Sequence, residues 1–354
     1  MKYHLLPLLL ATALLFAGCK KDPAPVNPGH NDSSSIAFLL NEGAWGGNDA
    51  SISRLHLDSD DIENHWFRAN NGRDLGDLAQ DLVHYGNKLY ATIHSSNKIE
   101  VIDPATGKSL KQIDMGQRGP RYIAPHQGKI YISCYDKTIV RIDTLSLEIE
   151  AACPLSGMQP EQLCAIGDSL YVCNCWQYDA NGDFEYDSTV SVVDIPRFIE
   201  TGKIAVGQNP GRIKAVDSHR FVVACSGNYQ TNIPATTLLV DIADGSRQTL
   251  PVAATNFDIY NNTLYIYQTT YDAQWHPTAL FYTVDLSTLQ ASPILQNHAS
   301  SIPNAYGINI HPATGNLYIC NSPYNANADI YTFRPDGTLL RKVEGGILSS
   351  KVVF

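Results

Sequence analysis

Residues 121–150 read RYIAPHQGKIYISCYDKTIVRIDTLSLEIE and contain four short segments that are typical of β-strands. These segments lie at 122–124, 130–133, 139–143 and 147–150. The later segments alternate apolar with polar residues, and turn-forming residues separate them. Alternation with a period of two predicts strands that are half-buried, and Gly, Asn and Asp clusters predict tight turns between them. This stretch therefore predicts one small sheet of four strands.

The same four-part unit recurs along the chain, and each copy carries an aliphatic residue followed by Tyr. The pairs are Leu89-Tyr90, Ile130-Tyr131, Leu170-Tyr171, Leu264-Tyr265 and Leu317-Tyr318, with Phe221-Val222 as a degraded copy. The following apolar segment ends in an Asp that starts a turn, at Asp103, Asp143, Asp194, Asp241 and Asp285. Strand-only units that repeat about every 40–50 residues predict a β-propeller. An ordinary β-sandwich is the alternative, but it does not explain why the order recurs.

The two ends of the chain supply a seventh unit. Ile36–Leu40 matches the second strand of the unit, Ile52–Leu55 the third, and the stretch to Phe67 the fourth. The missing first strand is predicted at Ser349–Phe354. We therefore expect an all-β fold, a seven-bladed propeller of four-stranded antiparallel blades over residues 36–354. Pairing of the N- and C-terminal strands would close it and remove free sheet edges.

The first 35 residues differ in composition from the repeats. Residues 1–18 have a charged start, a short apolar core and small residues before Cys19, which predicts a secretory signal peptide. Small residues directly before a Cys resemble the lipobox of bacterial lipoproteins, in which that Cys is acylated; an ordinary signal peptide followed by a free Cys is the alternative. Residues 19–35, rich in Pro, Asn, Gly and Ser, are expected to form a flexible, lipid-anchored tether.

The chain is acidic, with 25 Lys and Arg against 35 Asp and Glu and a net charge of −10. Loss of residues 1–18, which hold one Lys and no acid, would make this −11. An acidic chain without a basic stripe argues against nucleic acid and other anionic polymers as partners. Of eight Cys, the seven after Cys19 are an odd number, so at least one is expected to be free. Cys153–Cys164 is the disulfide that the sequence favours most, and the others are expected to be small packing residues.

The connections between second and third strands are long and uneven, whereas the turns at the other end of the blades are short. Antiparallel strands place all seven long connections on one face, and irregular loops on a rigid scaffold usually carry function. Their side chains are mainly aromatic and amide, which suits a large neutral ligand with apolar surface and hydrogen-bonding groups. The alternative is that these side chains only brace the loops. The candidate binding residues are Asn41, Glu42, Trp45, Asn48, Asp49, His94, Tyr135, Trp176, Tyr178, Asn228, Tyr229, Tyr271, Trp275, Tyr324 and Asn325.

The longest of these loops contains Asp179, Asn181 and Asp183, which alternate like the start of a calcium-binding loop. The Gly of that motif is at the fourth position, at Gly182, and the twelfth position is Val190 instead of Glu. The pattern is therefore partial, and a bound structural calcium and a solvated acidic loop both remain open.

Three features of the sequence carry a family resemblance: Asn41-Glu42-Gly43, residues 71–77, and the repeated Lys-Ile-Tyr and Val-Ile-Asp-Pro phrases. On these, and over nearly its full mature length, the chain resembles the seven-bladed surface-layer or YncE-like lipoproteins of Gram-negative gut bacteria. Within that group it is similar to the BtuG-type proteins. The resemblance implies a surface-exposed outer-membrane lipoprotein that binds cobalamin and passes it to an outer-membrane TonB-dependent transporter. Aromatic rings would pack the corrin, and amides would meet its amide fringe. His94 and His276 are candidates to ligate the cobalt.

No Gly-x-Ser-x-Gly elbow, His-Glu-x-x-His or phosphate-binding loop is present, so we expect a binding protein and no enzyme or catalytic cofactor. Two alternatives remain. One is adhesion to a glycan or a partner protein through the aromatic loops. The other is a metal-dependent propeller hydrolase or lyase, with residues at the starts of the first strands converging on the central channel: Asp77, Arg121, Glu161, Arg212 and Asn304.

Overall fold

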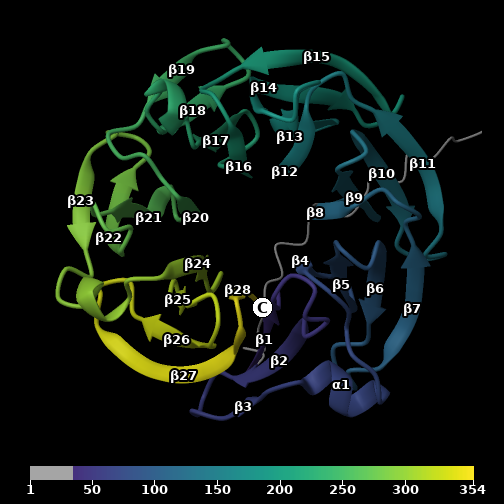
Figure 1. The fold of residues 1–354 in the computed structure, drawn as a ribbon, viewed down its shortest axis with the longest axis vertical. Helices are drawn as coiled ribbons and strands as arrows, with labels where there is room; N and C mark the ends of the chain where they lie inside the picture. Colours follow the sequence, from purple (N-terminus) through teal and green to yellow (C-terminus); the bar gives the residue numbers. More distant parts are fainter. Residues whose placement is uncertain (1–34) are drawn as a thin grey trace, which may run out of the picture. The chain divides into compact units, whose positions relative to one another are not determined.

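The computed structural model describes residues 35–354, in which seven sheets are arranged around a central axis (Figure 1). Each sheet has four antiparallel strands, so the predicted seven-bladed propeller is confirmed. The predicted signal peptide, Cys19 and the tether lie outside the described residues. Within the described part, no helix has the length and apolarity needed to cross a membrane.

Each blade runs from an innermost first strand to an outermost fourth strand. The first blade consists of β28 (Ser349–Val353), β1 (Ile36–Asn41), β2 (Ser51–His56) and β3 (Ile62–Glu63), and the second of β4 (Ala79–Tyr85), β5 (Lys88–Ile93), β6 (Lys98–Ile102) and β7 (Ser109–Asp114). The third contains β8 (Pro120–His126), β9 (Lys129–Cys134), β10 (Thr138–Asp143) and β11 (Ile149–Pro154), and the fourth β12 (Gln159–Ile166), β13 (Ser169–Tyr178), β14 (Phe184–Asp194) and β15 (Ile199–Ala205).

The remaining three blades follow the same order. The fifth contains β16 (Pro210–Ala215), β17 (Arg220–Cys225), β18 (Thr236–Asp241) and β19 (Arg247–Thr249). The sixth contains β20 (Asn256–Tyr260), β21 (Thr263–Tyr271), β22 (Pro277–Asp285) and β23 (Ala291–Ile294), and the seventh β24 (Ala305–Ile310), β25 (Leu317–Asn321), β26 (Asn327–Phe333) and β27 (Leu339–Ile347). Two single-turn 3₁₀ helices are η1 (Tyr229–Thr231) and η2 (Ala299–Ser301).

The two ends of the described chain meet in the first blade, as the sequence predicts. Strand β28 pairs with β1 in antiparallel register, with Phe38 opposite Val353 and Leu39 opposite Val352. The predicted fourth strand up to Phe67 is wrong in extent. Strand β3 has only two residues, and the chain then forms helix α1 (Trp66–Asn71), whose Trp66 and Phe67 are buried in the interface between the first two blades. Burial of two large aromatic rings favours the helix over a longer edge strand.

The repeated aliphatic–aromatic pair has a structural reason, because its two residues face opposite sides of the second strand. Leu89 packs in the interface with the first blade, whereas Tyr90 packs in the interface with the third. In the next blade, Ile130 and Tyr131 divide between the two flanking interfaces in the same way. Seven hydrophobic clusters thus form, one between each pair of neighbouring blades.

Polar side chains join neighbouring innermost strands, which do not pair with one another as a sheet. In each case a side-chain oxygen accepts a backbone N–H from the next blade, at 2.8–2.9 Å: Asp81 from Ile123, Gln162 from Ile213, Asp258 from Ile310, and Asn309 from Val352. These bonds satisfy buried N–H groups that no ladder reaches. They therefore hold the ring closed around its axis.

All seven described cysteines are buried and free, so the predicted Cys153–Cys164 disulfide is wrong. Cys153 lies on β11, the outermost strand of the third blade, whereas Cys164 lies on β12, the innermost strand of the fourth. Their side chains pack in different interblade clusters. Burial raises the pKa of Cys164 to about 12, which keeps it a neutral packing group.

Candidate ligand-binding face

Seven connections between second and third strands emerge at the same end of the blades, because neighbouring strands are antiparallel. We call this end the long-loop face. Its connections are residues 42–50, 94–97, 135–137, 179–183, 226–235, 272–276 and 322–326. The innermost strands begin at this end too, since Gln159 at the start of β12 lies opposite Trp176 near the end of β13. Loops and the start of the axial lining therefore form one continuous surface.

Strongly exposed aromatic side chains gather on the long-loop face. Within residues 35–354, every strongly exposed Trp, Tyr or Phe lies in one of these connections or at a strand end beside it. They are Trp45, Tyr178, Phe184, Tyr229, Tyr271, Trp275 and Tyr324. Their exposed fractions range from 47% for Phe184 to 77% for Trp45 and Tyr229. Large exposed apolar groups that cluster on one side of a protein mark an interaction surface.

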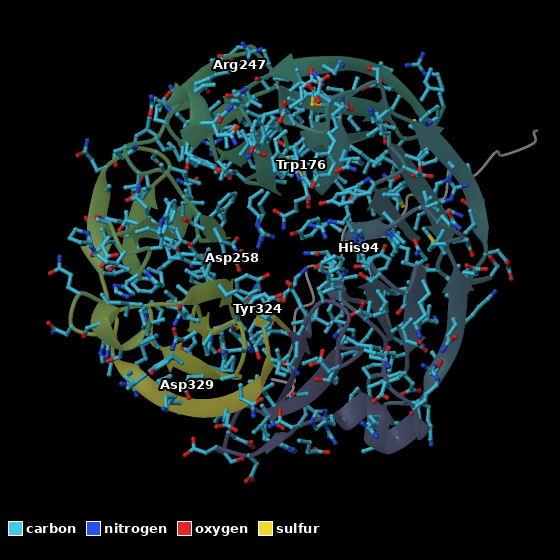
Figure 2. All side chains as sticks on the ribbon, viewed as in Figure 1. His94, Trp176, Arg247, Asp258, Tyr324 and Asp329 are labelled. Atoms are coloured by element: carbon cyan, nitrogen blue, oxygen red, sulfur yellow. The ribbon has the colours of Figure 1, made fainter. Side chains whose placement is uncertain are left out.

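Two hairpins extend this face. In the fourth blade, Trp176 contacts Tyr178 and Phe184, each with 5.2 Å between ring centroids, and it also lies edge-on to Tyr135 at 6.3 Å. In the sixth blade, Tyr271 and Trp275 are in contact at 6.0 Å. The first group is braced by its own rings, whereas Trp275 is 73% exposed. Figure 2 shows Trp176, Tyr324 and His94 around the centre of the ring and Arg247 at its rim.

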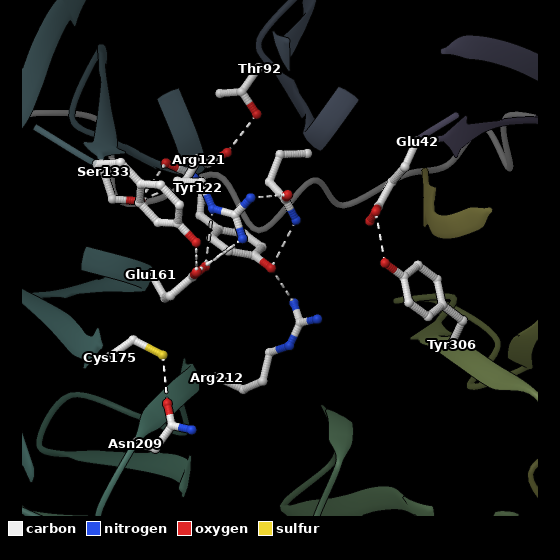
Figure 3. A network of polar contacts seen from close by, with 12 residues as sticks. Glu42, Thr92, Arg121, Tyr122, Ser133, Glu161, Cys175, Asn209, Arg212 and Tyr306 are labelled. Carbon is white, nitrogen blue, oxygen red and sulfur yellow. Dashed lines mark hydrogen bonds and ion pairs between the residues drawn. The ribbon is translucent and has the colours of Figure 1, made fainter. Parts of the chain in front are cut away.

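An axial channel of about 260 Å³ opens among the innermost strands, and all seven of them contribute to its lining. Nearest the long-loop face are side chains from the first positions of these strands, among them Gln80, Tyr122, Arg212 and Tyr306. Glu42, directly after β1, joins them. We call these five residues the channel mouth; Figure 3 labels Glu42, Tyr122, Arg212 and Tyr306 among them.

Beside the channel mouth, one guanidinium and one carboxylate form a closed pair. Nη2 of Arg121 donates to both oxygens of Glu161, each at 3.0 Å, and the Tyr135 hydroxyl donates to the same carboxylate (Figure 3). Burial alone would lower the pKa of Arg121, but the adjacent Glu161 carboxylate raises it above its usual value. Burial raises the pKa of Tyr135, so its hydroxyl stays protonated. This group is therefore neutral overall, and Nη1 of Arg121 joins it to the mouth by donating to Gln80 Oε1.

The polar groups of the mouth itself are less fully paired. Nη1 of Arg212 donates to the Tyr122 hydroxyl at 2.8 Å, and the Tyr306 hydroxyl donates to Glu42 Oε2 at 2.8 Å (Figure 3). Burial raises the pKa of Tyr122 to about 12 and raises that of Glu42 above its ordinary value. Neutral tyrosine hydroxyls and a guanidinium are hydrogen-bond donors, so the mouth suits a ligand group that accepts hydrogen bonds.

The sequence-predicted residues fall into three groups. Those with exposed side chains are Trp45, Asn48, Tyr178, Tyr229, Tyr271, Trp275, Tyr324 and Asn325. In the second group, Glu42 lines the channel, and Tyr135, which bonds to Glu161, lies edge-on to His94 at 5.1 Å and to Trp176 at 6.3 Å. Burial lowers the pKa of His94. The third group serves the fold: Asn41, Asp49 and Asn228.

Asn41 is only 1% exposed and cannot meet a ligand on the surface. Its amide donates to Ser51 and Ser53, and its oxygen accepts from Gly346 N and Ser349 Oγ. Asp49 accepts the N–H of Ala44 and braces its loop, and Asn228 caps η1 by accepting from Gln230 N. These three residues therefore serve the fold and are not part of the proposed site.

Sequence reasoning did not include Phe184, Gln80, Tyr122 or Tyr306 among the candidates. Phe184 lies directly opposite Tyr178, and the other three lie at the starts of first strands. The sequence holds a signal for Gln80, Tyr122 and Tyr306. Arg121, Glu161 and Arg212, which the sequence predicts at the channel, lie at comparable positions near the starts of first strands. Asp77, from the same set, accepts the N–H of Gly46 in a loop instead of lining the channel.

The alternation at Asp179, Asn181 and Asp183 is explained by a turn. Oδ1 of Asp179 accepts the backbone N–H groups of Asn181 and Asp183, and these bonds hold its pKa below the ordinary value. Across the described residues there is no group of three or more His, Cys, Asp or Glu side chains that could hold a metal ion. The turn accounts for the alternation by itself, and calcium binding by this loop stays a prediction.

Comparisons with known proteins agree on the fold. A family model described as "Domain of unknown function (DUF5074)" matches residues 36–174. No curated protein matches the sequence significantly. A quinoprotein alcohol dehydrogenase-like protein from Bacteroides thetaiotaomicron is similar in structure, with a TM-score of 0.64 at 14% identity over 91% of this chain and 78% of that one.

Two further structures show the same architecture at low identity. Hydrazine synthase from Kuenenia stuttgartiensis gives a TM-score of 0.63 at 14% identity, over 77% of this chain and 88% of that one. A dihydro-heme d1 dehydrogenase gives 0.56 at 10% identity, over 87% of this chain and 63% of that one. The chain is thus a seven-bladed propeller whose fold is similar to these solved structures, and a DUF5074 match covers its residues 36–174.

Proposed function

We propose that this protein captures a corrinoid, cobalamin, on the long-loop face and hands it to an outer-membrane TonB-dependent transporter. The observation that carries the proposal is the confinement of the strongly exposed aromatic side chains, among the described residues, to that one face. The choice of a corrinoid comes from the sequence resemblance to BtuG-type lipoproteins, as do the lipid anchor and the location at the cell surface.

The chemistry of the face is compatible with this ligand. A corrin is a flat apolar ring fringed with amides, and it carries a tail of phosphate, ribose and base. Exposed rings from five blades, among them Trp45, Tyr229 and Trp275, offer apolar area at low cost in side-chain entropy. Asn48 and Asn325 are exposed beside them and can exchange hydrogen bonds with ligand amides. Loops held on a closed ring lose little freedom on binding, which favours affinity.

The direct test is calorimetric titration of the purified propeller with cyanocobalamin, with thermal unfolding as a second measurement. We expect saturable binding and a rise in melting temperature, because a ligand that binds only the folded state stabilises it. Absence of heat together with an unchanged melting temperature at large ligand excess would refute corrinoid capture. Trp275→Ala should weaken binding, and Arg247→Met on the outermost strand β19 should leave it unchanged.

The transporter and the surface location need separate measurements on the full chain. We expect the lipidated protein to be cleaved by external protease in whole cells and to co-purify with a TonB-dependent transporter after mild detergent extraction. A Cys19→Ala variant should be released from the membrane. Retention of that variant in the membrane fraction would contradict anchoring at Cys19.

A second candidate function is adhesion to a glycan, since exposed tyrosine and tryptophan rings such as Tyr271 and Trp275 also stack on sugar faces. A glycan array distinguishes the two. Binding to sugars without binding to cyanocobalamin would favour adhesion, and the reverse would favour corrinoid capture.

A further inference from the structure

We propose that Arg212 and Tyr122 form a phosphate subsite at the channel mouth, which holds the phosphodiester of the ligand tail while the corrin lies on the aromatic loops. The assignment of this phosphate to a corrinoid rests on the proposed function. The subsite itself rests on the charge and hydrogen-bond pairing inside the channel.

Three cationic side chains line the axial channel, Lys214, Lys351 and Arg212, and two of them pair with a carboxylate of the neighbouring blade. Lys351 meets Asp81 at 2.6 Å, and Lys214 meets Asp258. Arg212, also in the channel lining, forms no ion pair with any carboxylate of residues 35–354. A half-buried guanidinium that no carboxylate contacts directly can pair with an incoming anion.

The hydrogen bonds at the mouth leave donors free for such an anion. A guanidinium carries five N–H groups, and Arg212 uses one of its terminal nitrogens on the Tyr122 hydroxyl. That hydroxyl accepts a second bond from Gln80 Nε2 at 3.1 Å, so both of its acceptor positions are used and its proton remains to be donated. Arg212 and Tyr122 thus offer several donors around one point in the mouth (Figure 3).

The position of Arg212 connects the channel with the aromatic loops. Strand β16 begins at Pro210, which lies opposite Cys225 at the end of β17, and Arg212 lies opposite Ala224. The next residues of the chain, 226–235, form the loop that carries the exposed Tyr229. A ligand that covers this face can therefore reach the mouth with a phosphate group while its apolar body stays on the rings.

Glu42 opposes an anion at the mouth. Its carboxylate lines the same channel and accepts the Tyr306 hydroxyl. A negative charge here weakens the attraction of Arg212 for phosphate. Replacing Glu42 by Gln keeps an acceptor for Tyr306 and removes the charge, so this change should strengthen phosphate binding. Variants at Arg212 and Glu42 are thus expected to act in opposite directions.

The test compares two corrinoids on the same variants by calorimetry. Cyanocobalamin has the phosphate tail, and dicyanocobinamide lacks it. We expect Arg212→Met to lower the affinity for cyanocobalamin roughly 10- to 100-fold, the usual range for the loss of one or two charge-assisted hydrogen bonds. The affinity for dicyanocobinamide should not change. Tyr122→Phe should act the same way and less strongly. Arg247→Met, which removes an exposed arginine on β19, is the matched control and should change neither.

If Arg212→Met loses affinity equally for both corrinoids, or for neither, the phosphate subsite is overturned while corrinoid capture stands. A second arm uses inorganic phosphate alone, followed by ³¹P line broadening on wild type, Arg212→Met and Glu42→Gln. Broadening that depends on Arg212 without any corrinoid binding would uphold the subsite and refute the proposed ligand. If Arg212→Met does not fold, Glu42→Gln decides: unchanged or weaker phosphate binding in that variant contradicts the inference.

Discussion

The two sets of connections at opposite ends of the blades differ in how their polar groups are satisfied. At the third-to-fourth turns, a single Asp repeats the same solution: Asp103, Asp143 and Asp285 each accept the backbone N–H groups two and three residues further on. The second-to-third connections share no such pattern. They vary from three residues at 135–137 to ten at 226–235, and they expose aromatic rings.

The two sets of connections differ in whether the fold alone accounts for their side chains. An Asp turn is complete in itself, because the residue that begins it also satisfies its backbone. A Trp or Tyr that stays largely exposed on the long-loop face contributes little burial to the fold, so we expect its role to lie in contact with a partner outside the chain. One end of the propeller is therefore expected to respond to mutation through stability, and the other through binding.

The largest effect on stability is expected at Asn41, which lies at the long-loop end but belongs to the fold. Asn41→Ala removes four buried hydrogen bonds that join β1, β2, β27 and β28, and leaves their partners unsatisfied. We expect a loss of about 2–4 kcal/mol in the free energy of unfolding, measured by urea denaturation. The exposed neighbour Asn48→Ala is the control; equal losses in both would contradict this division.

The two tryptophans Trp176 and Trp275 provide a matched pair on the long-loop face itself. Trp176→Ala should cost about 1–3 kcal/mol, because Trp176 is half-buried against three other rings. Trp275→Ala should change stability by less than about 0.5 kcal/mol. Both should weaken cyanocobalamin, by roughly tenfold or more for a ring that contacts the ligand directly. Unchanged affinity in both would place the site elsewhere.

Asp143 tests the turns at the opposite end. Asp143→Ala should cost about 1 kcal/mol, since the carboxylate accepts two backbone N–H groups and pairs with Lys129 at 2.6 Å. These partners, Lys129 first, hold the pKa of Asp143 below its ordinary value. Its contribution is therefore present at neutral pH and is lost as the pH falls below the unfolded value into the strongly acidic range. Corrinoid affinity should not change in this variant; a clear loss would contradict the separation of the two ends.

The smallest effect is expected for the stability of Glu42→Gln, and its size depends on pH. Burial raises the pKa of Glu42, so the folded state holds its proton more tightly than the unfolded state does. The favourable contribution of that proton is complete below the unfolded pKa and disappears as the pH rises through the folded value. Glu42→Gln should therefore melt slightly higher than wild type at pH 7–8 and equally near pH 4. A lower melting temperature at pH 8 would show that the carboxylate is well paired.

Much of this molecule follows from its repeat. The positions of the second and third strands, the closure by residues 349–353 and the long-loop face were all predictable, because alternation and turn residues act over a few neighbours. Helix α1 was not, since its Trp66 and Phe67 are stabilised by the neighbouring blade and not by local propensity. The same holds for Asn41, which the sequence placed in a loop and the fold buries.

The sequence by itself determined the seven blades, the order of their strands and the aromatic composition of one face. Only the tertiary structure decided which polar side chains meet at the axis. Arg121 and Glu161 are 40 residues apart, and Arg212 is 90 residues from Tyr122, yet ring closure brings them together. Periodicity specifies a strand from its neighbours alone, whereas the pairing of charges around an axis depends on how seven distant strands are arranged. For that reason the sequence does not predict that Arg212 lacks an ion pair, and only the tertiary structure shows it.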